Sequence, residues 1–508
     1  MKQKNDQKES LLKLFYYILS VAAGIIIINN VFMSGVTYVT KKDFFLPAIE
    51  TMAIALLLIF ALVHNRFSFF KPHIPIPVIL VVFFAYQILV SKSIMFLTAT
   101  WDAGTVLDNV ILIERGLYDV AYMDYFSHYT YNDGIFLLEY CLAVILDNMG
   151  ILTQYNMILA MIVLQSAANT AVAWLVYDVL KRLHDRQIGY LGLWVYILWF
   201  GLIGWQSVVY NDMTSIIFPI GAFDLYLRRD SSRWDYPKWI GIFVLVFMGY
   251  KIKPTVLIIL IAIGMSEGFR FLIQRDELKE HGYEILSTLL SAVAVFALVS
   301  SIFAATLDAT PLKINEELNT GPLHMLMMGM NDANDGCFVY TDVTYSFSYE
   351  TKQERTQAQL LRIKSRFENY TPQRFLSFIS KKALVVFNDG SFAWGEEAGF
   401  YDRKYTHGPL SDFFKNIYYN EGSVFPWKLN IWQLLWYMTL ILLFLVSRLK
   451  YDKNTLVLAL AVTGIFVFDM LFEARARYLI VYVPVIMILA IHGLSSMIEE
   501  RRLSDHGC

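Results

Sequence analysis

Long apolar runs separated by short polar stretches make up most of the chain. A helix needs about 20 apolar residues to cross the hydrocarbon core of a bilayer, and these runs lack the polar face of a surface helix. The pattern therefore predicts an all-α polytopic membrane protein with about 12 transmembrane helices. The predicted spans are residues 14–31, 45–63, 77–90, 157–180, 188–208, 216–227, 239–250, 254–268, 285–305, 431–446, 456–472 and 478–491.

Clusters of Lys and Arg set the predicted orientation, because basic residues near helix ends favour the cytoplasmic side. The clusters at residues 181–186 and 228–238 fall inside only if the short apolar stretch 135–146, which contains Glu139, does not cross. We therefore expect that stretch to be a partly immersed helix on the outer face. Both termini are then cytoplasmic, and the first run is expected to be an uncleaved span and not a signal peptide.

The stretch 239–268 contains Lys251 and Lys253 between two apolar runs. One long helix would place both lysines at mid-bilayer, which is costly without partners. Pro254 also disfavours a helical conformation at the residue before it. We expect instead a short hairpin whose tip holds both lysines on the outer side.

Two polar segments lie on the outer face in this topology. The first, residues 93–134, is expected to carry a short surface helix that opens just after Asp102. The second, residues 307–429, is too aromatic for a disordered linker and is expected to be an extracytoplasmic domain of short helices. The chain thus divides into a transmembrane core with the outer loop (1–306), the extracytoplasmic domain (307–429) and C-terminal transmembrane helices (430–508).

The composition excludes several classes of protein. Of 508 residues, 56% are hydrophobic and only 17% are charged, which is fewer charges than a soluble domain carries. The net charge of −2 gives no reason to expect a nucleic-acid partner. The three cysteines lie in unrelated contexts and offer neither a disulfide framework nor metal-ligand spacing.

Few polar residues are expected at the outer ends of the helices. A carboxylate together with cations suits sugar transfer from a polyprenyl phosphate, since a base must accept the proton of the acceptor hydroxyl. Cations must also stabilise the departing phosphate. We expect Asp102 to be the general base. The full set at the outer ends is Asp102, Tyr210, Asn211, Asp212, Lys251, Lys253, Glu473, Arg475 and Arg477.

Each candidate also has a purely structural interpretation. Asp102 is suited to capping the helix that follows it, and Asp212 is suited to a turn in which it has a capping role. The two lysines can extend to lipid headgroups, and the charged residues at 473–477 can form an interfacial salt-bridge cluster. His324 beside a Met-rich run fits packing, and the three Asn-Asp-Gly sequences fit turns.

The sequence resembles the GT-C superfamily of membrane glycosyltransferases, and within it bacterial relatives of the protein O-mannosyltransferases and of the lipid A aminoarabinose transferase. Asp102 in TWDAGTVL matches the essential Asp of the family's first outer loop, and VVYNDMTSIIFPIGAFDLYLRR is similar to its next outer turn, with Asp212 as the second acidic residue. Lys253-Pro254-Thr255 and Arg477-Tyr478 resemble the family's cation positions near the donor phosphate. The chain departs from the family in its three predicted spans before the loop, and in a single Asp where the O-mannosyltransferases have an acidic pair.

These features predict an inverting glycosyltransferase on the outer face of a bacterial plasma membrane. It would move a sugar from a polyprenyl-phosphate donor to an envelope glycan, glycolipid or protein acceptor. Asp212 is expected to orient the acceptor or a divalent metal, whose presence is left open, and no other cofactor is expected. The predicted phosphate contacts are Lys251, Lys253, Arg475 and Arg477, and the predicted sugar or acceptor pocket contains Tyr125, His128, Tyr131, Tyr210 and His324.

The rival prediction is a transporter or flippase of lipid-linked saccharides with no chemistry of its own. A transporter places ionisable groups near mid-membrane and often shows paired halves. This sequence places its polar groups at one face and has no internal repeat. The enzyme is therefore the favoured prediction.

Overall fold

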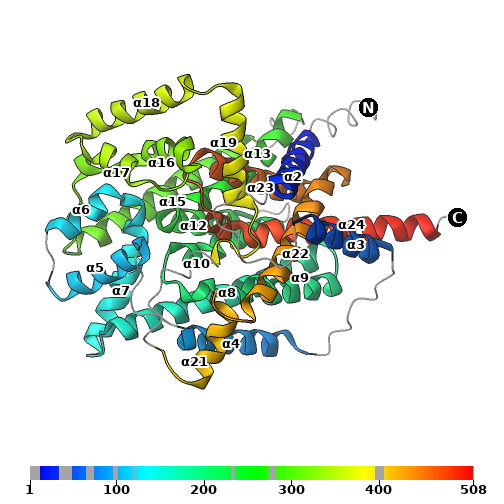
Figure 1. Cartoon of the computed structure of the whole chain (residues 1–508), viewed down its shortest axis with the longest axis horizontal. Coiled ribbons are helices and arrows are strands. Elements are labelled where there is room, and N and C mark those ends of the chain that lie inside the picture. Colours follow the sequence, from blue (N-terminus) through cyan, green and yellow to red (C-terminus); the bar gives the residue numbers. More distant parts are fainter. Residues whose placement is uncertain are drawn as a thin grey trace.

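The computed structural model describes residues 12–33, 48–64, 74–94, 101–117, 120–229, 235–273, 282–394 and 406–506. Within these residues every regular element is a helix (Figure 1). The predicted all-α class is therefore confirmed for the described part of the chain.

Seven helical segments are long and apolar enough to cross a membrane. Two shorter apolar helices, α3 (Ala48–His64) and the segment Pro254–Phe269, add to them. Several spans are thus supported, whereas the predicted number of twelve is not confirmed. The seven are α2 (Leu14–Met33), α4 (Ile76–Ile94), α8 (Gln154–Leu183), α15 (Gly282–Asp308), α22 with its last turn (Phe425–Arg448), α23 (Lys453–Leu471), and the segment Ala476–Leu503, which contains most of α24 (Val483–His506).

The predicted span 188–208 is wrong as a continuous helix. Helix α9 (Arg186–Leu198) ends at Leu198, and two short 3₁₀ turns, Phe200–Leu202 and Trp205–Ser207, follow it. Gly204 between them has a φ of 111°, a left-handed value that an L side chain rarely adopts. Non-helical backbone inside a membrane protein must be shielded from lipid, and this stretch is almost entirely buried in the protein.

Helix α12 (Asp235–Ile252) is longer than the twelve residues predicted for it. Its 18 residues extend about 27 Å at the α-helical rise. The next helical turn begins at Pro254, and α13 (Leu257–Ile273) continues from it, so that Lys253 alone separates the two arms. The predicted hairpin is therefore present, with a tighter tip than expected.

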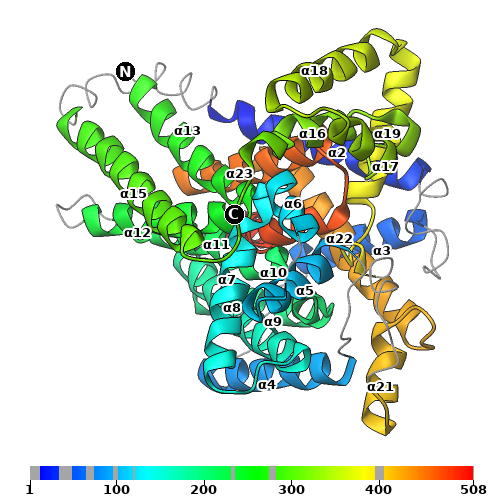
Figure 2. The ribbon, with the colours of Figure 1, turned by 90° about the vertical axis from the view of Figure 1, so that its left-hand side faces the viewer.

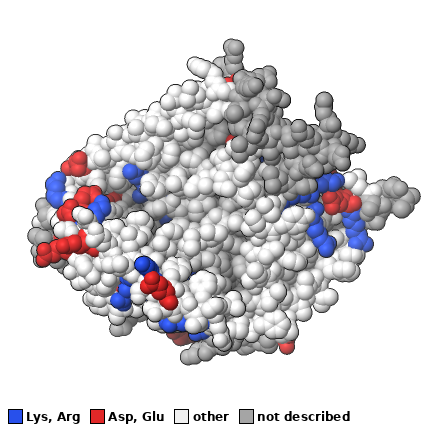
Figure 3. Space-filling view, turned by 90° about the horizontal axis from the view of Figure 1, so that it is seen from above, with Lys and Arg blue, Asp and Glu red and all other residues white. Residues whose placement is uncertain are grey.

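The apolar helices differ widely in how much of their surface is buried in the protein. The segment Ala476–Leu503 is 89% buried over its most apolar window, whereas α15 is only 6% buried. Figure 2 shows α15 at the edge of the helical assembly. A helix with apolar side chains on all faces and little protein around it is suited to lipid contact. Charged side chains on the face in Figure 3 gather in a few clusters, with a broad uncharged surface between them.

A smaller hydrophobic core lies beside the main one. It joins α5 (Asp102–Glu114), α7 (Asp133–Asn148) and the first half of α8 through residues such as Val106, Phe136 and Met161. Helix α6 (Val120–His128) connects α5 to α7. The helix predicted just after Asp102 is thus present, and it is held by side chains of this second core.

Most of the segment between α15 and α22 lies as a helical layer over one end of the assembly (Figures 1 and 2). Its backbone is tied to α6, because His128 O accepts from both the backbone and the hydroxyl of Thr320. Its short helices agree with the predicted helical character. They are α16 (Gly321–Gly329), α17 (Tyr340–Phe347), α18 (Lys352–Glu368), α19 (Pro372–Phe387) and α21 (Pro409–Tyr418).

Residues 388–394 of this segment do not belong to the helical layer, because they enter the main core. The indole of Trp199 donates to Gly390 O at 3.0 Å, and the indole of Trp205 donates to Ser391 O at 3.1 Å. Gln433 Oε1 accepts from the Gly390 backbone N–H at 2.9 Å. The broken helix described above and this inserted turn therefore satisfy each other's polar groups, as buried backbone requires.

Candidate functional site

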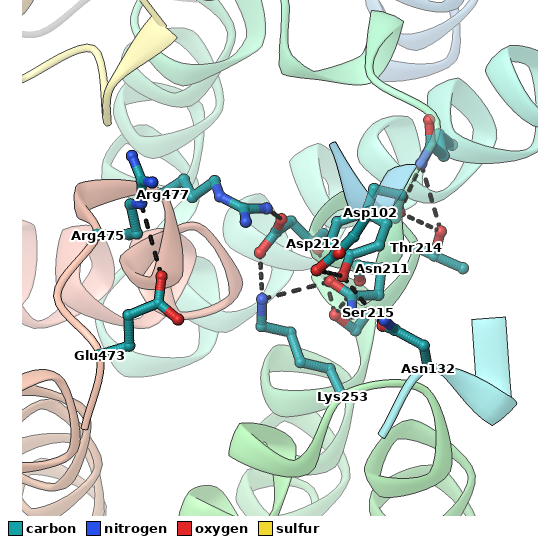
Figure 4. A network of polar contacts seen from close by, with 12 residues as sticks. Asp102, Asn132, Asn211, Asp212, Thr214, Ser215, Lys253, Glu473, Arg475 and Arg477 are labelled. Carbon is teal, nitrogen blue, oxygen red and sulfur yellow. Dashed lines mark hydrogen bonds and ion pairs between the residues drawn. The ribbon is translucent and has the colours of Figure 1, made fainter. Parts of the chain in front are cut away.

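Four segments that are distant in sequence meet around the ion-paired side chains of Asp212, Lys253 and Arg477. They are the start of α5, the short helix α10 (Asn211–Ser215), the α12–α13 connection at Lys253, and the turn before α24. Figure 4 shows Lys253 and Arg477 reaching Asp212 from different directions. Of the residues predicted at the outer helix ends, Asp212, Lys253 and Arg477 are thus in direct contact.

Asp212 forms ion pairs with two buried cations. The Lys253 ammonium contacts Oδ1, and Arg477 Nη1 donates to Oδ2 at 3.0 Å. The side chains are only 3%, 8% and 9% exposed for Asp212, Lys253 and Arg477. Helix α10 has no side-chain cap hydrogen bond, so the structural interpretation of Asp212 as a capping residue is not supported.

The local backbone explains why Lys253 enters the site and Lys251 does not. Lys253 has an extended conformation, with φ −147° and ψ 114°, as expected for a residue before proline. Lys251 is still in α12, and its ammonium lies 5.0 Å from the ring centroid of Phe303 on α15. The structure thus separates the two lysines. Lys251, which was predicted to contact the phosphate, lies outside the Asp212 cluster.

The two arginines also separate. Arg475 is extended, and its Nε lies 3.7 Å from Glu473 Oε1. Arg477 follows two residues later, and its guanidinium stacks over the Trp101 ring at 4.3 Å and over the Tyr478 ring at 5.2 Å. Aromatic faces attract cations and leave the guanidinium edge free for hydrogen bonds. The salt-bridge interpretation of this cluster therefore fits Arg475, whereas Arg477 belongs to the site.

Asp102 lies next to this cluster and is held by tyrosines. Tyr125 donates a hydrogen bond to its carboxylate, and the single hydroxyl proton of Tyr210 is shared between Oδ2, a long contact at 3.4 Å, and Asn132 Oδ1 at 3.0 Å. The residue before α5 is the N-cap, and no side chain caps the helix. Asp102 therefore does not act as the helix cap that its position allows, and its carboxylate faces the polar cluster.

Burial raises the pKa of the Asp102 carboxyl above its usual range. The hydrogen bond from Tyr125 and the charge of Arg477 oppose this rise but do not cancel it. A carboxylate with a raised pKa binds a proton more strongly and is a better general base. The environment of Asp102 is therefore suited to accepting a proton.

Asn132 connects the two tyrosines that hold Asp102. Its amide Nδ2 donates to Tyr125 OH at 2.8 Å, and its Oδ1 accepts from Tyr210 OH at 3.0 Å. The sequence analysis missed Asn132, because Asn-Asp-Gly was interpreted as a turn, whereas it starts α7. Its position beside the aromatic run 125–131 was the one available signal.

Two further residues of the site were not singled out for the roles they have. The Trp101 ring packs edge-on against Tyr210, with centroids 5.0 Å apart, and also lies under Arg477. The Tyr478 ring lies 5.1 Å from the Lys253 ammonium. Both residues adjoin a predicted site residue in sequence, which is the signal that would have found them.

The remaining predicted pocket residues divide into two groups. Tyr131 lies near Asp102 and Tyr210, and burial together with the charge of Asp102 raises the pKa of its hydroxyl. His128 instead stacks on Phe347 at 3.8 Å and bonds the Leu318 carbonyl at 2.8 Å, which ties α6 to the outer layer. His128 is therefore a packing residue.

His324 is buried in the outer layer at the Tyr129 side of the site. Its Nδ1 bonds Ser346 Oγ at 2.8 Å, and its ring centroid is 6.4 Å from that of Tyr129. Burial lowers its pKa to about 4, so the imidazole is neutral at pH 7. His324 therefore lies beside the tyrosine cluster, and within the described part of the chain its hydrogen bond goes to Ser346 and not to Asp102 or Asp212.

The residues at Asp212 do not fit a metal ion. Each of its oxygens already accepts from a cation, and no group of three His, Cys, Asp or Glu side chains suited to a metal occurs among the described residues. Two positive charges beside the carboxylate would repel a divalent cation. The arrangement is suited to an anion, which Lys253 and Arg477 can bind together.

These features define an integral membrane protein with a buried polar site at the ends of its helices. The chain belongs to a family described as conserved hypothetical integral membrane protein, whose model matches residues 9–497. No curated protein matches the sequence. Because the family description names no activity, the function must be argued from the site.

Proposed function

We propose that this protein is an inverting glycosyltransferase that uses a polyprenyl-phosphate sugar donor on the outer face of a bacterial plasma membrane. One observation carries the proposal: a carboxylate with a raised pKa, Asp102, lies beside the buried cations Lys253 and Arg477. A base adjacent to a phosphate-binding pair is the minimum that such a transfer requires.

In this mechanism the acceptor hydroxyl donates its proton to Asp102 as its oxygen attacks the anomeric carbon. The new C–O bond forms on the face opposite the phosphate, and the bond between the anomeric carbon and the phosphate oxygen breaks. Both bonding electrons leave with the polyprenyl phosphate, whose negative charge Lys253 and Arg477 stabilise. Inversion follows from this single displacement.

Asp212 acts in this proposal as the residue that positions the cations. It keeps the ammonium and the guanidinium close together before a phosphate arrives, and their mutual repulsion is offset by its charge. A phosphate oxygen would then replace part of these contacts. Preorganised charge of this kind needs little rearrangement during the reaction.

The acceptor is an envelope glycan, a glycolipid or a surface protein. The aromatic side chains around Asp102, including Trp101, Tyr125, Tyr131 and Tyr210, suit the stacking of sugar rings. The polyprenyl tail would lie in the membrane lipid, against the exposed apolar side chains of the helices. Nucleic acid has no place in this proposal.

The alternative is a transporter or flippase of lipid-linked saccharides. One observation favours it: Asp469 is an ionisable residue fully buried in an apolar helix, a position typical of transport pathways. A transporter moves the donor without consuming it. The two proposals therefore differ in whether the sugar changes its chemical linkage.

The test is complementation of a deletion strain with wild type, Asp102→Asn or Asp108→Asn, followed by mass spectrometry of envelope glycans at matched membrane levels. Asp108 is the control, since it lies on the same helix and bonds Gln154 at 2.9 Å instead of the site tyrosines. Wild type and Asp108→Asn should restore a missing sugar, and Asp102→Asn should not. Equal restoration by Asp102→Asn would overturn the transferase proposal.

A further inference from the structure

Helices α12 and α15 meet in a seam that ends at Lys251. Near the start of both helices, Tyr236 OH lies 2.7 Å from Ser287 Oγ. Farther along, the rings of Phe247 and Phe296 are 5.2 Å apart. Only 6% of the most apolar window of α15 is buried, and Figure 2 shows this helix at the edge of the assembly. The seam therefore follows the part of the protein that is best suited to lipid contact.

The Lys251 ammonium has only aromatic neighbours. It lies 5.0 Å from the ring centroid of Phe303 and 6.0 Å from that of Phe296, both on α15. Within the described part of the chain, Lys251 forms no ion pair and no hydrogen bond. Lys251 is half-buried and the Phe296 side chain is 43% exposed. A partly exposed lysine is charged at neutral pH, so an anion can reach this cation from the lipid side.

Two structural interpretations account in part for a lysine at this position. The last turn of a helix favours a cation through the helix dipole, and the long stem of lysine lets its ammonium reach lipid headgroups. Neither explains why the ammonium lies against two rings of the neighbouring helix. The rings attract the charge, but its three N–H groups still lack oxygen acceptors. A phosphate would supply them.

Lys251 also adjoins the buried site around Asp212. It lies two residues before Lys253, which turns to the other side and contacts Asp212. The Lys251 carbonyl packs so closely on Gly134 that no side chain fits there. Asn132, two residues before that glycine, bonds both site tyrosines. The lipid-facing cation and the buried cation therefore share one short connection.

Building on the proposed function, we propose that Lys251, Phe296 and Phe303 form a separate lipid-phosphate site. This rim site binds the headgroup of the polyprenyl-phosphate donor before the donor reaches Lys253 and Arg477. The ammonium binds the phosphate, and the exposed apolar side chains of α15 contact the lipid chain. The rim site takes no part in bond formation.

The test places the photoreactive residue p-benzoylphenylalanine in place of Phe296 in the full-length protein, held in phosphatidylcholine nanodiscs. The two radiolabelled probes are farnesyl phosphate and the neutral farnesol. Farnesyl phosphate should label this position about fivefold more strongly than farnesol, as expected for one lysine facing an anionic headgroup. The same photoreactive residue in place of Leu289, which is 60% exposed and about two turns earlier on α15, should be labelled equally by both probes.

Variants at Lys251 test the cation itself. Lys251→Met should reduce labelling by farnesyl phosphate to the level of farnesol, and Lys251→Gln provides a second uncharged variant in case the first folds poorly. Lys251→Arg should retain the labelling, because it retains the charge. Lys313→Met is the matched control, since Lys313 is exposed shortly after the end of α15, and it should also retain the labelling.

Equal labelling in the charged and uncharged Lys251 variants would overturn the inference and leave the proposed transferase intact. Displacement of the label by excess phosphatidylglycerol would overturn it as well, because the site would then belong to bulk phospholipid. Labelling that withstands phosphatidylglycerol supports a donor site. Asp102→Asn should leave the labelling unchanged, so a failure of the transferase proposal in the glycan analysis is distinguishable from a failure at Lys251.

Discussion

Arg477 donates a hydrogen bond to Asp212 at 3.0 Å across 265 positions of sequence. The same carboxylate contacts Lys253 through its other oxygen. One short side chain thus fixes two cations that come from different helices. This relationship determines what each substitution in the cluster is expected to do.

Asp212→Asn should strongly destabilise the protein. Removing one partner of a buried ion pair leaves an uncompensated charge and costs about 3–5 kcal/mol, and here two cations lose their partner. Melting temperature in detergent should fall sharply for Asp212→Asn and recover in part for Asp212→Asn combined with Lys253→Met. A double variant no more stable than the single one would show that the pair does not determine stability.

The protonation of Asp102 should respond to Tyr210. Burial raises the Asp102 pKa, and hydrogen bonds from Tyr125 and Tyr210 lower it. Tyr210→Phe removes one of these bonds, so the Asp102 pKa should rise further. During acidification the Asp102 carboxylate should therefore become protonated at a higher pH than in the wild type. Infrared difference titration of the protonated carboxyl band measures this, with Asp102→Asn as the blank. A band that titrates at the same pH in Tyr210→Phe would contradict the contact.

Gly134 should not tolerate a side chain. A Cβ at this position would lie 1.8 Å from the carbonyl oxygen of Lys251, so α7 and α12 would have to separate. Overpacking of this kind costs about 1–3 kcal/mol. Gly264→Ala is the matched control, because its Cβ meets nothing within 4 Å and the change favours helix by about 1 kcal/mol. Thermal unfolding of the two variants should therefore shift in opposite directions.

Lys382 should make stability depend on pH in the alkaline range. Burial lowers its pKa from 10.5 to about 8, so between these values the unfolded chain binds more protons than the folded one. Stability therefore rises with pH across this window. A neutral amine keeps two N–H groups, enough for its two carbonyl partners. Lys382→Met should flatten the rise, whereas Lys381→Met, whose side chain is 44% exposed, should leave it unchanged.

The sequence predicted well what depends on local pattern. The apolar runs became helices, and Asp212, Lys253 and Arg477 met because each lies at the start of a helical turn or in the connection between two helices. The sequence did not separate Lys251 from Lys253. That distinction depends on the residue at which α12 ends, and a shift of two positions turns a side chain to another face of a helix.

Other features depend on contacts that no local pattern carries. The break after Leu198 is stabilised by the inserted residues Gly390 and Ser391, whose carbonyls accept from two tryptophans far away in sequence. Without knowledge of that partner, the apolar run 188–208 is indistinguishable from a span. Asn132 was missed for the same reason, since its role depends on Tyr210.

The turn at residues 388–394 has a consequence for how this protein can be divided or recombined. A chimera that exchanges the segment between α15 and α22 with that of a relative would also replace the turn at residues 388–394, which packs against the break after α9. Such an exchange should yield a folded product only when Trp199, Trp205 and Gln433 are transferred with the turn. The segment therefore has to be exchanged together with the helices that it packs against, and it is not an independent module.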